Sequence, residues 1–439
     1  MLFRSPQRVR LNAGAGVPVG PSGASDSGPD AALIGTLRLG FSESGGLRVG
    51  VAVSGGGDST ALLHLMHRTA LGANCTLFAV TVDHALRLDS AAEARDVAGF
   101  CQTLGVHHTT LRWDHGAVSG NLMDAARQAR LHLMSDWAAG MGIAHIALGH
   151  TADDQAETFL MGLGRASGLD GLVGMRAVWL QDGITWSRPM LNHSRADLRA
   201  YLLRAGVAWV DDPTNSDDRF TRIKARKAMA ALAPLGITAQ SLATSMAHLQ
   251  HALQAVQQAV HRAVKADVAE VAGGLTIARK GYDAQPFDVQ RRMLVAAIGW
   301  MSGSPYPPRM AAQVTLQLKT AAGLDCTLQG CRFQCKGDVI HIIREPKAAA
   351  LHACASDQVW DHRWCVAGPH APDLTLRALG AEGVRFCKNW RDSGISRDVL
   401  LVSPAIWRGD ALISAPLAGF NPEWQASIPN GFHKFILSH

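Results

Sequence analysis

"VAVSGGGDST", at residues 51–60, predicts the architecture of the chain around it. Apolar residues lead into three consecutive glycines, and "ALLHLMH" follows, so the stretch predicts a strand, a tight loop and a helix. Glycines let backbone N–H groups converge without obstruction by Cβ atoms, and the beginning of a helix attracts anions. We therefore expect a phosphate-binding loop, with a glycine-rich structural turn as the alternative. The candidate phosphate-binding residues of the loop are Ser54, Gly55, Gly56, Gly57, Asp58 and Ser59.

Asp58 narrows the chemistry of this loop. The phosphate loop of kinases and GTPases carries a Lys after its last glycine, and no Lys follows Gly57 here. A carboxylate is out of place beside phosphates unless it binds Mg²⁺, which pyrophosphate brings with it. We expect Asp58 to be catalytic and to bind Mg²⁺ through pyrophosphate.

Strands and helices alternate through the first half of the chain. The segments at 75–86, 106–113 and 143–150 predict further strands, separated by helical patterns. This alternation predicts an α/β fold with a doubly wound parallel sheet, which binds ligands at the carboxyl ends of its strands. Polar clusters lie at those ends, at residues 54–59, 83–87 and 150–157. We place Asp83 and His84 over the site of the phosphate-binding loop, although His84 could equally be a capped loop histidine.

Composition excludes several classes of protein. With 439 residues, 47% of them hydrophobic and 18% charged, the chain should form two or three domains with sizeable cores. No run approaches the ~18 apolar residues of a membrane span. The net charge of +6 favours an anionic partner such as nucleic acid, with a mildly basic protein lacking such a partner as the alternative. The eight cysteines form no CxxC pair, so we expect buried thiols in a reduced, cytoplasmic protein.

Changes in sequence character predict four segments. Residues 1–32, rich in Gly, Ala, Ser and Pro, should be a disordered extension. Residues 33–218 should form the catalytic α/β domain, and residues 219–345 a mainly helical domain that ends in a hairpin turning at residues 336–338. Residues 346–439 should form a small, mostly-β domain.

The segments around the loop resemble those of a known family. "SGGGDS" is similar to the SGGxDS loop of the PP-loop ATP pyrophosphatases, whose fold is that of the adenine nucleotide alpha hydrolases. "TVDHALRLDS", "AARQAR", "LGHTADDQAETFLMGLGRASGLDGLVGM" and "DPTNSDDRFTRIKAR" resemble, in order and spacing, segments of the bacterial tRNA(Ile)-lysidine synthetase family. The resemblance is dense over residues 47–226 and looser beyond. The 2-thiocytidine synthetases share it in part, but they use CxxC cysteines that this chain lacks.

The resemblance implies an ATP-dependent ligation with Mg²⁺. ATP would adenylate O2 of the wobble cytidine in the CAU anticodon of tRNA(Ile), and L-lysine would then replace AMP. Residues 219–345, together with the mostly-β residues 346–439, would bind the body of the tRNA. A homodimer is possible, and no membrane association is expected. The alternatives are another PP-loop enzyme acting on tRNA, such as a 2-thiocytidine synthetase, or a non-catalytic tRNA-binding paralogue.

Three acids lie on the first turns of one predicted helix. Asp153 and Glu157 are four residues apart and share a face, whereas Asp154 is displaced by about 100°. With His150 at the preceding strand end, they should bind lysine or cytidine, and we count Asp154 as catalytic. The alternative is that the acids merely complement the helix dipole.

The candidate basic residues come from three segments. Arg130 matches an arginine of the family's helix and would be catalytic, with a surface ion pair as the alternative. Arg165 opens a loop that would close over the cytidine. Arg222 and Arg226 are four residues apart, which suits tRNA phosphates, and Arg226 would also be catalytic; a solvated basic helix is the alternative. Ala166 replaces a glycine of the family, which we expect to stiffen the loop.

Overall fold

The computed structural model describes residues 28–41, 47–70, 75–84, 90–114, 122–210, 221–304 and 306–437. It comprises two compact units, Met1–Leu253 and Gln254–His439. The division falls within α9 (Ala239–Asp267), whereas the domain limits predicted from sequence at residues 218 and 345 remain predictions. Most of the predicted N-terminal extension, the end of the 83–87 cluster and the "DPTNSDDRF" segment lie outside the described residues.

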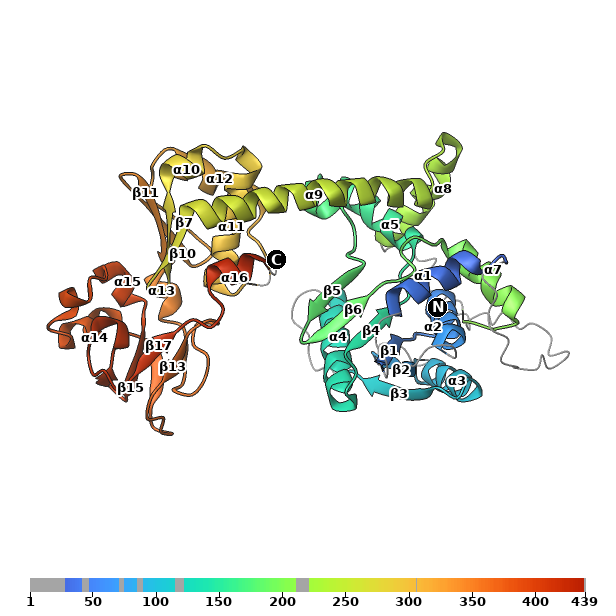
Figure 1. The fold of residues 1–439 in the computed structure, drawn as a ribbon, viewed down its shortest axis with the longest axis horizontal. Helices are drawn as coiled ribbons and strands as arrows, with labels where there is room; N and C mark the ends of the chain where they lie inside the picture. Colours follow the sequence, from blue (N-terminus) through green and yellow to red (C-terminus); the bar gives the residue numbers. More distant parts are fainter. Residues whose placement is uncertain are drawn as a thin grey trace, which may run out of the picture. The chain divides into compact units, whose positions relative to one another are not determined.

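A six-stranded sheet organises the first unit (Figure 1). The strands lie in the order β3-β2-β1-β4-β6-β5, and every neighbouring pair is parallel except β5 with β6. This confirms the predicted α/β fold. The strands are β1 (Leu47–Ala52), β2 (Cys75–Asp83), β3 (His107–Arg112), β4 (His145–Leu148), β5 (Val178–Gln181) and β6 (Ile184–Ser187).

Alternating side chains of the central strands build two separate cores. Val49, Val51 and Val53 pack against helices on one face of the sheet, and Ala52 belongs to the core on the other face. The first face is covered by α1 (Ala31–Phe41), α2 (Gly57–Ala70), α3 (Ser90–Thr103) and α7 (Arg195–Ala205). The second is covered by α4 (Leu122–Met141). Helices on both faces are the doubly wound arrangement that the alternation predicted.

The remaining helices of the first unit follow β4 and α7. The acidic segment forms α5 (Ala152–Leu163), and a short helix, α6 (Leu169–Leu172), comes next. The basic segment "RIKARK" lies on α8 (Thr221–Leu232), which continues into the 3₁₀ turn η2 (Ala233–Leu235). Helix α8 packs against α5, so basic and acidic segments meet.

The second unit contains a five-stranded antiparallel sheet in the order β7-β8-β11-β10-β9. The predicted hairpin is present, because β10 (Cys331–Lys336) pairs with β11 (Val339–Arg344). The other strands are β7 (Val268–Val271), β8 (Gly274–Ala278) and β9 (Cys326–Leu328). The sheet shares a core with the end of α9 and with α11 (Phe287–Ser302), α12 (Met310–Ala321) and α16 (Phe432–Leu437). Short α10 (Arg279–Asp283) follows β8.

Short strands dominate the end of the chain. Four form the antiparallel order β12-β14-β15-β16, and two pair as β13-β17. They are β12 (Ala353–Ala355), β13 (Cys365–Ala367), β14 (Thr375–Ala378), β15 (Pro404–Arg408), β16 (Ala411–Ser414) and β17 (Gln425–Ser427). Between them lie α13 (Pro346–Ala349), α14 (Gly380–Phe386), η3 (Trp390–Ser393), α15 (Arg397–Leu401) and η4 (Pro416–Ala418). All eight cysteines are free thiols. Among the described helices, none combines the length and the apolar character of a membrane crossing.

A half-buried histidine fixes α2 against α7. The Nδ1 atom of His64 lies 2.6 Å from the hydroxyl of Tyr201, which is fully buried. Burial, reinforced by the charge of Arg68, lowers the pKa of His64 to about 4. The fold therefore holds His64 in its neutral form. This contact matters for the site because α2 follows the glycine loop and α7 begins beside it.

We predict that His64→Gln reduces the pH dependence of stability. An unfolded chain protonates His64 near pH 6.5 and the folded chain only near pH 4, so its contribution is complete above pH 6.5 and is lost as the pH falls toward 4. Between pH 7 and pH 5 this amounts to at most about 2 kcal/mol, because solvent screens part of the half-buried ring. Urea unfolding of both proteins at both pH values measures it. An equal loss of stability in the variant would contradict the prediction.

Candidate active site

The glycine loop joins β1 to α2, and the segment after α7 holds it. Gly55 has φ of +81°, in the left-handed region that favours glycine. Its carbonyl accepts a hydrogen bond of 3.0 Å from the N–H of Val210. Because α2 begins at Gly57, the first N–H groups of that helix have no acceptor within the helix. This is the backbone arrangement that phosphate binding requires.

Ser59 closes the loop internally. Its hydroxyl accepts from the N–H of Ser54 and donates to the carbonyl of Gly56, both at 3.1 Å. The Ser54 hydroxyl lies 3.1 Å from the Ser59 hydroxyl oxygen, but Ser54 itself is exposed. Ser59 therefore fixes the loop conformation, and Ser54 is the hydroxyl that is more accessible to a phosphate oxygen.

Main-chain contact sets the distance between this loop and the end of β4. A Cβ atom on Gly149 would lie 2.9 Å from the Cα and 3.0 Å from the N of Ser59. Only glycine fits there without moving backbone. Since Gly149 directly precedes His150 and α5, the polar clusters of two strand ends lie together, as the sheet topology predicted.

Two acids of α5, Asp154 and Glu157, are buried. Asp154 Oδ2 accepts from the N–H and the hydroxyl of Thr151, at 2.9 and 3.0 Å, which caps the helix. Burial would raise the pKa of Asp154, but the charge of Arg195 and the Thr151 N–H outweigh it, so this pKa lies below its ordinary value. The side chain of Glu157 is only 2% exposed. Both carboxylates therefore need cationic partners.

Arg195, at the start of α7, supplies the central partner. Its Nε donates to Asp58 Oδ2 at 3.0 Å, its Nη2 to Asp154 Oδ1 at 3.3 Å and its Nη1 to Glu157 Oε1 at 3.4 Å. Its backbone N–H donates to Asp153 Oδ2 at 2.7 Å. One residue thus contacts Asp58 and all three predicted acids of α5, and the sequence analysis did not identify it.

The base of α8 completes this cluster. Arg226 Nε donates to Glu157 Oε1 at 2.9 Å, and Arg222 Nε forms an ion pair with Oε2 at 3.5 Å. Both arginines are more than a third exposed, so part of each guanidinium faces solvent.

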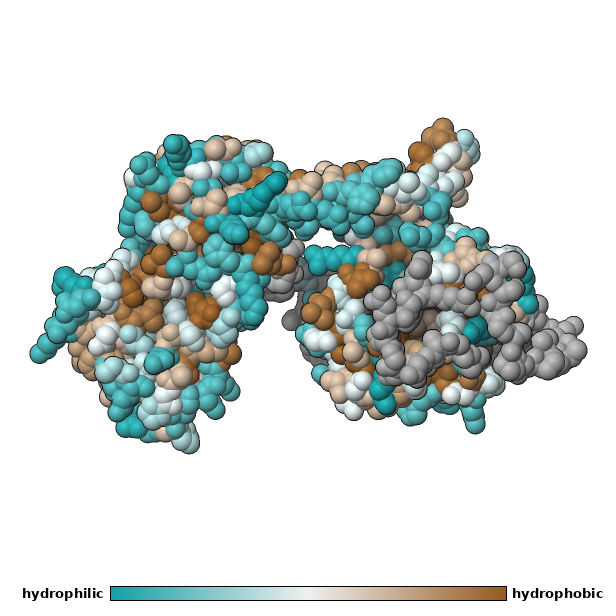
Figure 2. Space-filling model, in the orientation of Figure 1, coloured by the Kyte–Doolittle hydropathy of each residue, from teal (hydrophilic) through white to brown (hydrophobic). Residues whose placement is uncertain are grey.

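The other end of α8 is hydrophobic on its surface (Figure 2), and Leu235 in η2 is 74% exposed.

His150 lies beside the acids in its neutral form. Its Nδ1 accepts from Arg188 Nε at 3.0 Å, and the Arg188 guanidinium packs over the ring of Trp179 at 4.0 Å. Burial lowers the pKa of His150 to about 4, assisted by nearby arginines and opposed by Asp154. Arg188 is another residue that the sequence analysis did not select.

The predicted residues at the end of β2 form a neighbouring group. The carbonyl of Asp83 accepts from the N–H of Trp113, and the Trp113 ring lies edge-on to His84. Burial and the charge of Arg130 lower the pKa of His84. The charge of Arg130 also lowers the pKa of His150, so this arginine acts electrostatically on a histidine at the end of β2 and on another at the end of β4.

Arg165 is placed apart from these clusters. It is exposed in the turn after α5, where its N–H donates to the carbonyl of Gly162. The next residue, Ala166, has φ of +51°, a conformation that strains alanine but not glycine. The replacement therefore adds backbone strain, which sequence alone did not indicate.

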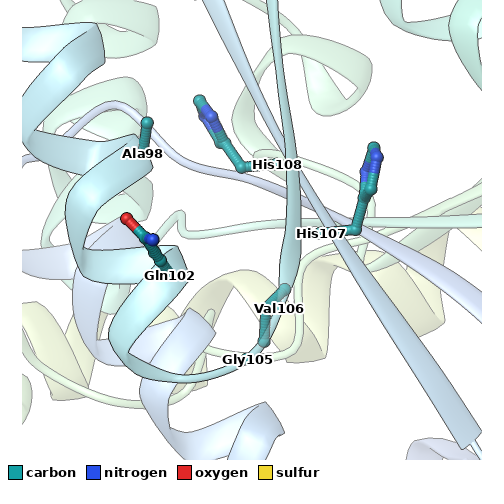
Figure 3. A pocket seen from close by; sticks show the side chains of 6 residues that line it. All are labelled: Ala98, Gln102, Gly105, Val106, His107 and His108. Carbon is teal, nitrogen blue, oxygen red and sulfur yellow. The ribbon is translucent and has the colours of Figure 1, made fainter.

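A hollow between α3 and β3 contains none of the predicted site residues (Figure 3). It is lined by Ala98, Gln102, Gly105, Val106, His107 and His108. His107 and His108 diverge from neighbouring positions of the strand, and His108 Nε2 lies 2.9 Å from the hydroxyl of Thr81. The chemistry-bearing side chains are elsewhere, at the carboxyl ends of β1 and β4.

Asp58 suits the metal role predicted for it. Its Oδ1 is buried and has no hydrogen-bond partner in the described part of the chain. Burial raises the pKa of Asp58, and the charge of Arg195 offsets only part of this effect. The described residues contain no cluster of three or more His, Cys, Asp or Glu that could hold a metal ion. Mg²⁺ would therefore take most of its ligands from phosphates and water, as it commonly does.

The parallel sheet, the glycine loop at its strand end and the orphaned carboxylate oxygen define a PP-loop ATP-binding protein. The family model of the PP-loop domain matches residues 36–233. Comparison with curated proteins is more specific, and the chain belongs to the tRNA(Ile)-lysidine synthase family.

Three relatives with that name illustrate the similarity. The protein of Ruegeria pomeroyi is 42% identical over 411 residues, which cover 93% of this chain and 98% of the relative. That of Mesorhizobium japonicum is 36% identical and covers 76% of both chains. That of a Bradyrhizobium species is 41% identical over 56% of this chain and 69% of the relative.

We predict that Glu157→Gln destabilises the protein by roughly 2–3 kcal/mol. The change leaves Arg195, Arg222 and Arg226 without a shared anion, and the partial exposure of two of them keeps the cost below that of a fully buried unpaired charge. Urea unfolding measures the loss. Asp136→Asn, an exposed change on α4, is the matched control and should stay within ~0.5 kcal/mol. Equal stabilities of the two variants would contradict the prediction.

Proposed function

We propose that this protein ligates L-lysine to position 2 of the wobble cytidine in the CAU anticodon of tRNA(Ile), at the expense of ATP. The product would read AUA instead of AUG and carry isoleucine identity instead of methionine. The observation that carries the proposal is the site itself: a phosphate loop beside Asp58, whose Oδ1 is unpartnered, and buried acids that could accept an amine. Membership of the family supports the particular substrates.

In the first step, the cytidine O2 would attack the α-phosphorus of ATP, and pyrophosphate would leave. The loop N–H groups and Ser54 would bind the leaving phosphates. Asp58 Oδ1 would bind Mg²⁺, which neutralises charge on pyrophosphate as it departs. Arg222 and Arg226 have partly exposed guanidinium groups close to the acids, so they could reach phosphate oxygens of ATP or of tRNA.

In the second step, the ε-amine of lysine would attack C2 of the adenylated cytidine, and AMP would leave with the electron pair of the C2–O bond. The amine must first lose a proton, and Asp153, Asp154 and Glu157 are the candidate acceptors. His150 is neutral, so it can position the base without repelling the ammonium group of incoming lysine.

The cytidine must leave its stack to reach this site. Arg165, in the exposed turn after α5, is placed on a loop that could close over it. The net charge of +6 favours tRNA binding, which we assign mainly to residues 219–345. A cytoplasmic location follows from the tRNA substrate. Light scattering of the purified protein tests whether it forms a homodimer.

The decisive assay combines purified protein, ATP, Mg²⁺, labelled L-lysine and tRNA carrying a CAU anticodon. We expect label in the tRNA together with stoichiometric AMP and pyrophosphate. Pyrophosphate release with another nucleophile and no labelled tRNA would indicate a different PP-loop enzyme. Binding of tRNA without ATP turnover would indicate a non-catalytic paralogue.

We predict that Asp58→Ala lowers pyrophosphate release by ~10²-fold or more, the scale of losing a preorganised electrostatic group. Binding of tRNA should stay within about threefold, because Asp58 provides no phosphate contact to the nucleic acid. Rapid-quench assays and filter binding measure the two quantities. Turnover at the wild-type rate would remove Asp58 from its proposed role.

We predict that Arg226→Ala lowers turnover at least ~10-fold and reduces the salt slope of tRNA binding by about 1. Lys224→Ala, an exposed change on the same helix, is the control and should affect only the salt slope. Turnover and binding measured between 50 and 200 mM salt distinguish them, on the scale at which phosphate contacts matter. Arg226 would be an ordinary surface residue if both its rate and its slope were unaltered.

A further inference from the structure

Arg195 joins two parts of the site that are far apart in the chain. Its guanidinium contacts Asp58 on α2, 137 residues away, and both Asp154 and Glu157 on α5. Each of the three guanidinium nitrogens contacts a different carboxylate. The side chain is 18% exposed, so it is largely enclosed by the acids.

The start of α7 fixes where this side chain lies. Ser194 caps the helix, accepting from the N–H of Asp197 at 3.1 Å, while Asp197 Oδ2 accepts in return from the N–H of Ser194. The next N–H, that of Arg195, donates to Asp153 Oδ2 at 2.7 Å. Both the backbone and the side chain of Arg195 are therefore attached to the acid cluster.

The hydrogen bond from Arg195 places the two carboxylate oxygens of Asp58 in different environments. Oδ2 accepts from Arg195 at 3.0 Å, whereas Oδ1 is buried with no hydrogen-bond partner in the described segments. A carboxylate held by one oxygen cannot rotate freely, so the other oxygen keeps a fixed direction. A ligand to Mg²⁺ needs this orientation, because the ion demands near-ideal octahedral geometry.

We propose that Arg195 is a positioning residue for the adenylation step: it holds Asp58 by Oδ2 so that Oδ1 is presented to the Mg²⁺ of the leaving pyrophosphate, and it couples that carboxylate to the acids of α5. The inference rests on the proposed function. It assigns no contact with substrate to Arg195, which acts through the carboxylates.

Arg195→Lys tests the inference while keeping the charge. A single ammonium group cannot place separate donors on three carboxylates, so Asp58 should lose its orientation although the cluster stays neutralised. The matched control is Arg204→Lys, on the same helix, where the arginine pairs with Asp30 near the surface. We expect Arg195→Lys to weaken Mn²⁺ binding in the presence of inorganic pyrophosphate by ~10–100-fold, the usual effect of losing an outer-shell partner. Electron paramagnetic resonance of Mn²⁺ measures this without turnover.

Kinetics provide the second measurement. The Mg²⁺ concentration for half-maximal pyrophosphate release should rise by ~10-fold or more in Arg195→Lys, while the KM for tRNA changes less than about threefold. Arg204→Lys should match the wild type in both. The inference would be overturned if Arg195→Lys bound Mn²⁺ normally. It would also be overturned if the variant contained less folded protein but kept the wild-type Mg²⁺ dependence.

A double variant guards against misfolding. Arg195→Gln removes the charge and could destabilise the cluster, whereas Arg195→Gln combined with Glu157→Gln removes one charge of each sign. If the double variant is folded, it should still bind Mn²⁺ weakly; restored binding would overturn the inference.

The wild type is assayed for lysine incorporation in parallel. Absence of incorporation overturns the proposed function and this inference together, whereas incorporation with an unchanged Arg195→Lys overturns the inference alone.

Discussion

Four carboxylates around one arginine, three at its guanidinium group and one at its backbone N–H, form the interaction on which the site depends. The carboxylates of Asp58, Asp154 and Glu157 contact the guanidinium group of Arg195. The carboxylate of Asp153 accepts a hydrogen bond from the Arg195 backbone N–H. Like charges enclosed at such short range would repel and would be costly to bury without a cation among them. The cluster therefore ties α2, α5 and α7 to one another. The core on one face of the sheet holds α2 and α7, and the close approach of Gly149 to Ser59 brings the start of α5 to the same strand ends, so packing and electrostatics support the same geometry.

The parts of this site that follow local patterns could be predicted from the sequence. The glycine loop and the acids of α5 each lie within a few residues of one another, and periodicity or composition reveals such groups. The arginines of α8 are four residues apart, which places them on one face of a helix. In the structure they both contact Glu157, although their partner could not be identified from spacing alone.

Other features depend on tertiary contacts or backbone angles that no local pattern records. Arg195 meets Asp58 only because α7 packs against α2, 137 residues away in the chain. The left-handed φ of Ala166 is likewise invisible in its sequence neighbours. The hairpin of β5 and β6 differs, because Asp182 and Gly183 form a recognisable two-residue turn with positive φ at both positions. That signal was present between the two apolar runs and was not used.

The close approach of Gly149 to Ser59 bears on how such a site could be altered by design. The spacing between the phosphate loop and the acid-bearing helix is set by main-chain atoms in contact, so it does not vary with the side chains that α5 displays. In the proposed mechanism, replacing acids of that helix would therefore change which nucleophile is accepted without shifting the point at which ATP is cleaved. Conversely, a larger residue at position 149 would separate the two halves of the reaction, whatever side chains surround them.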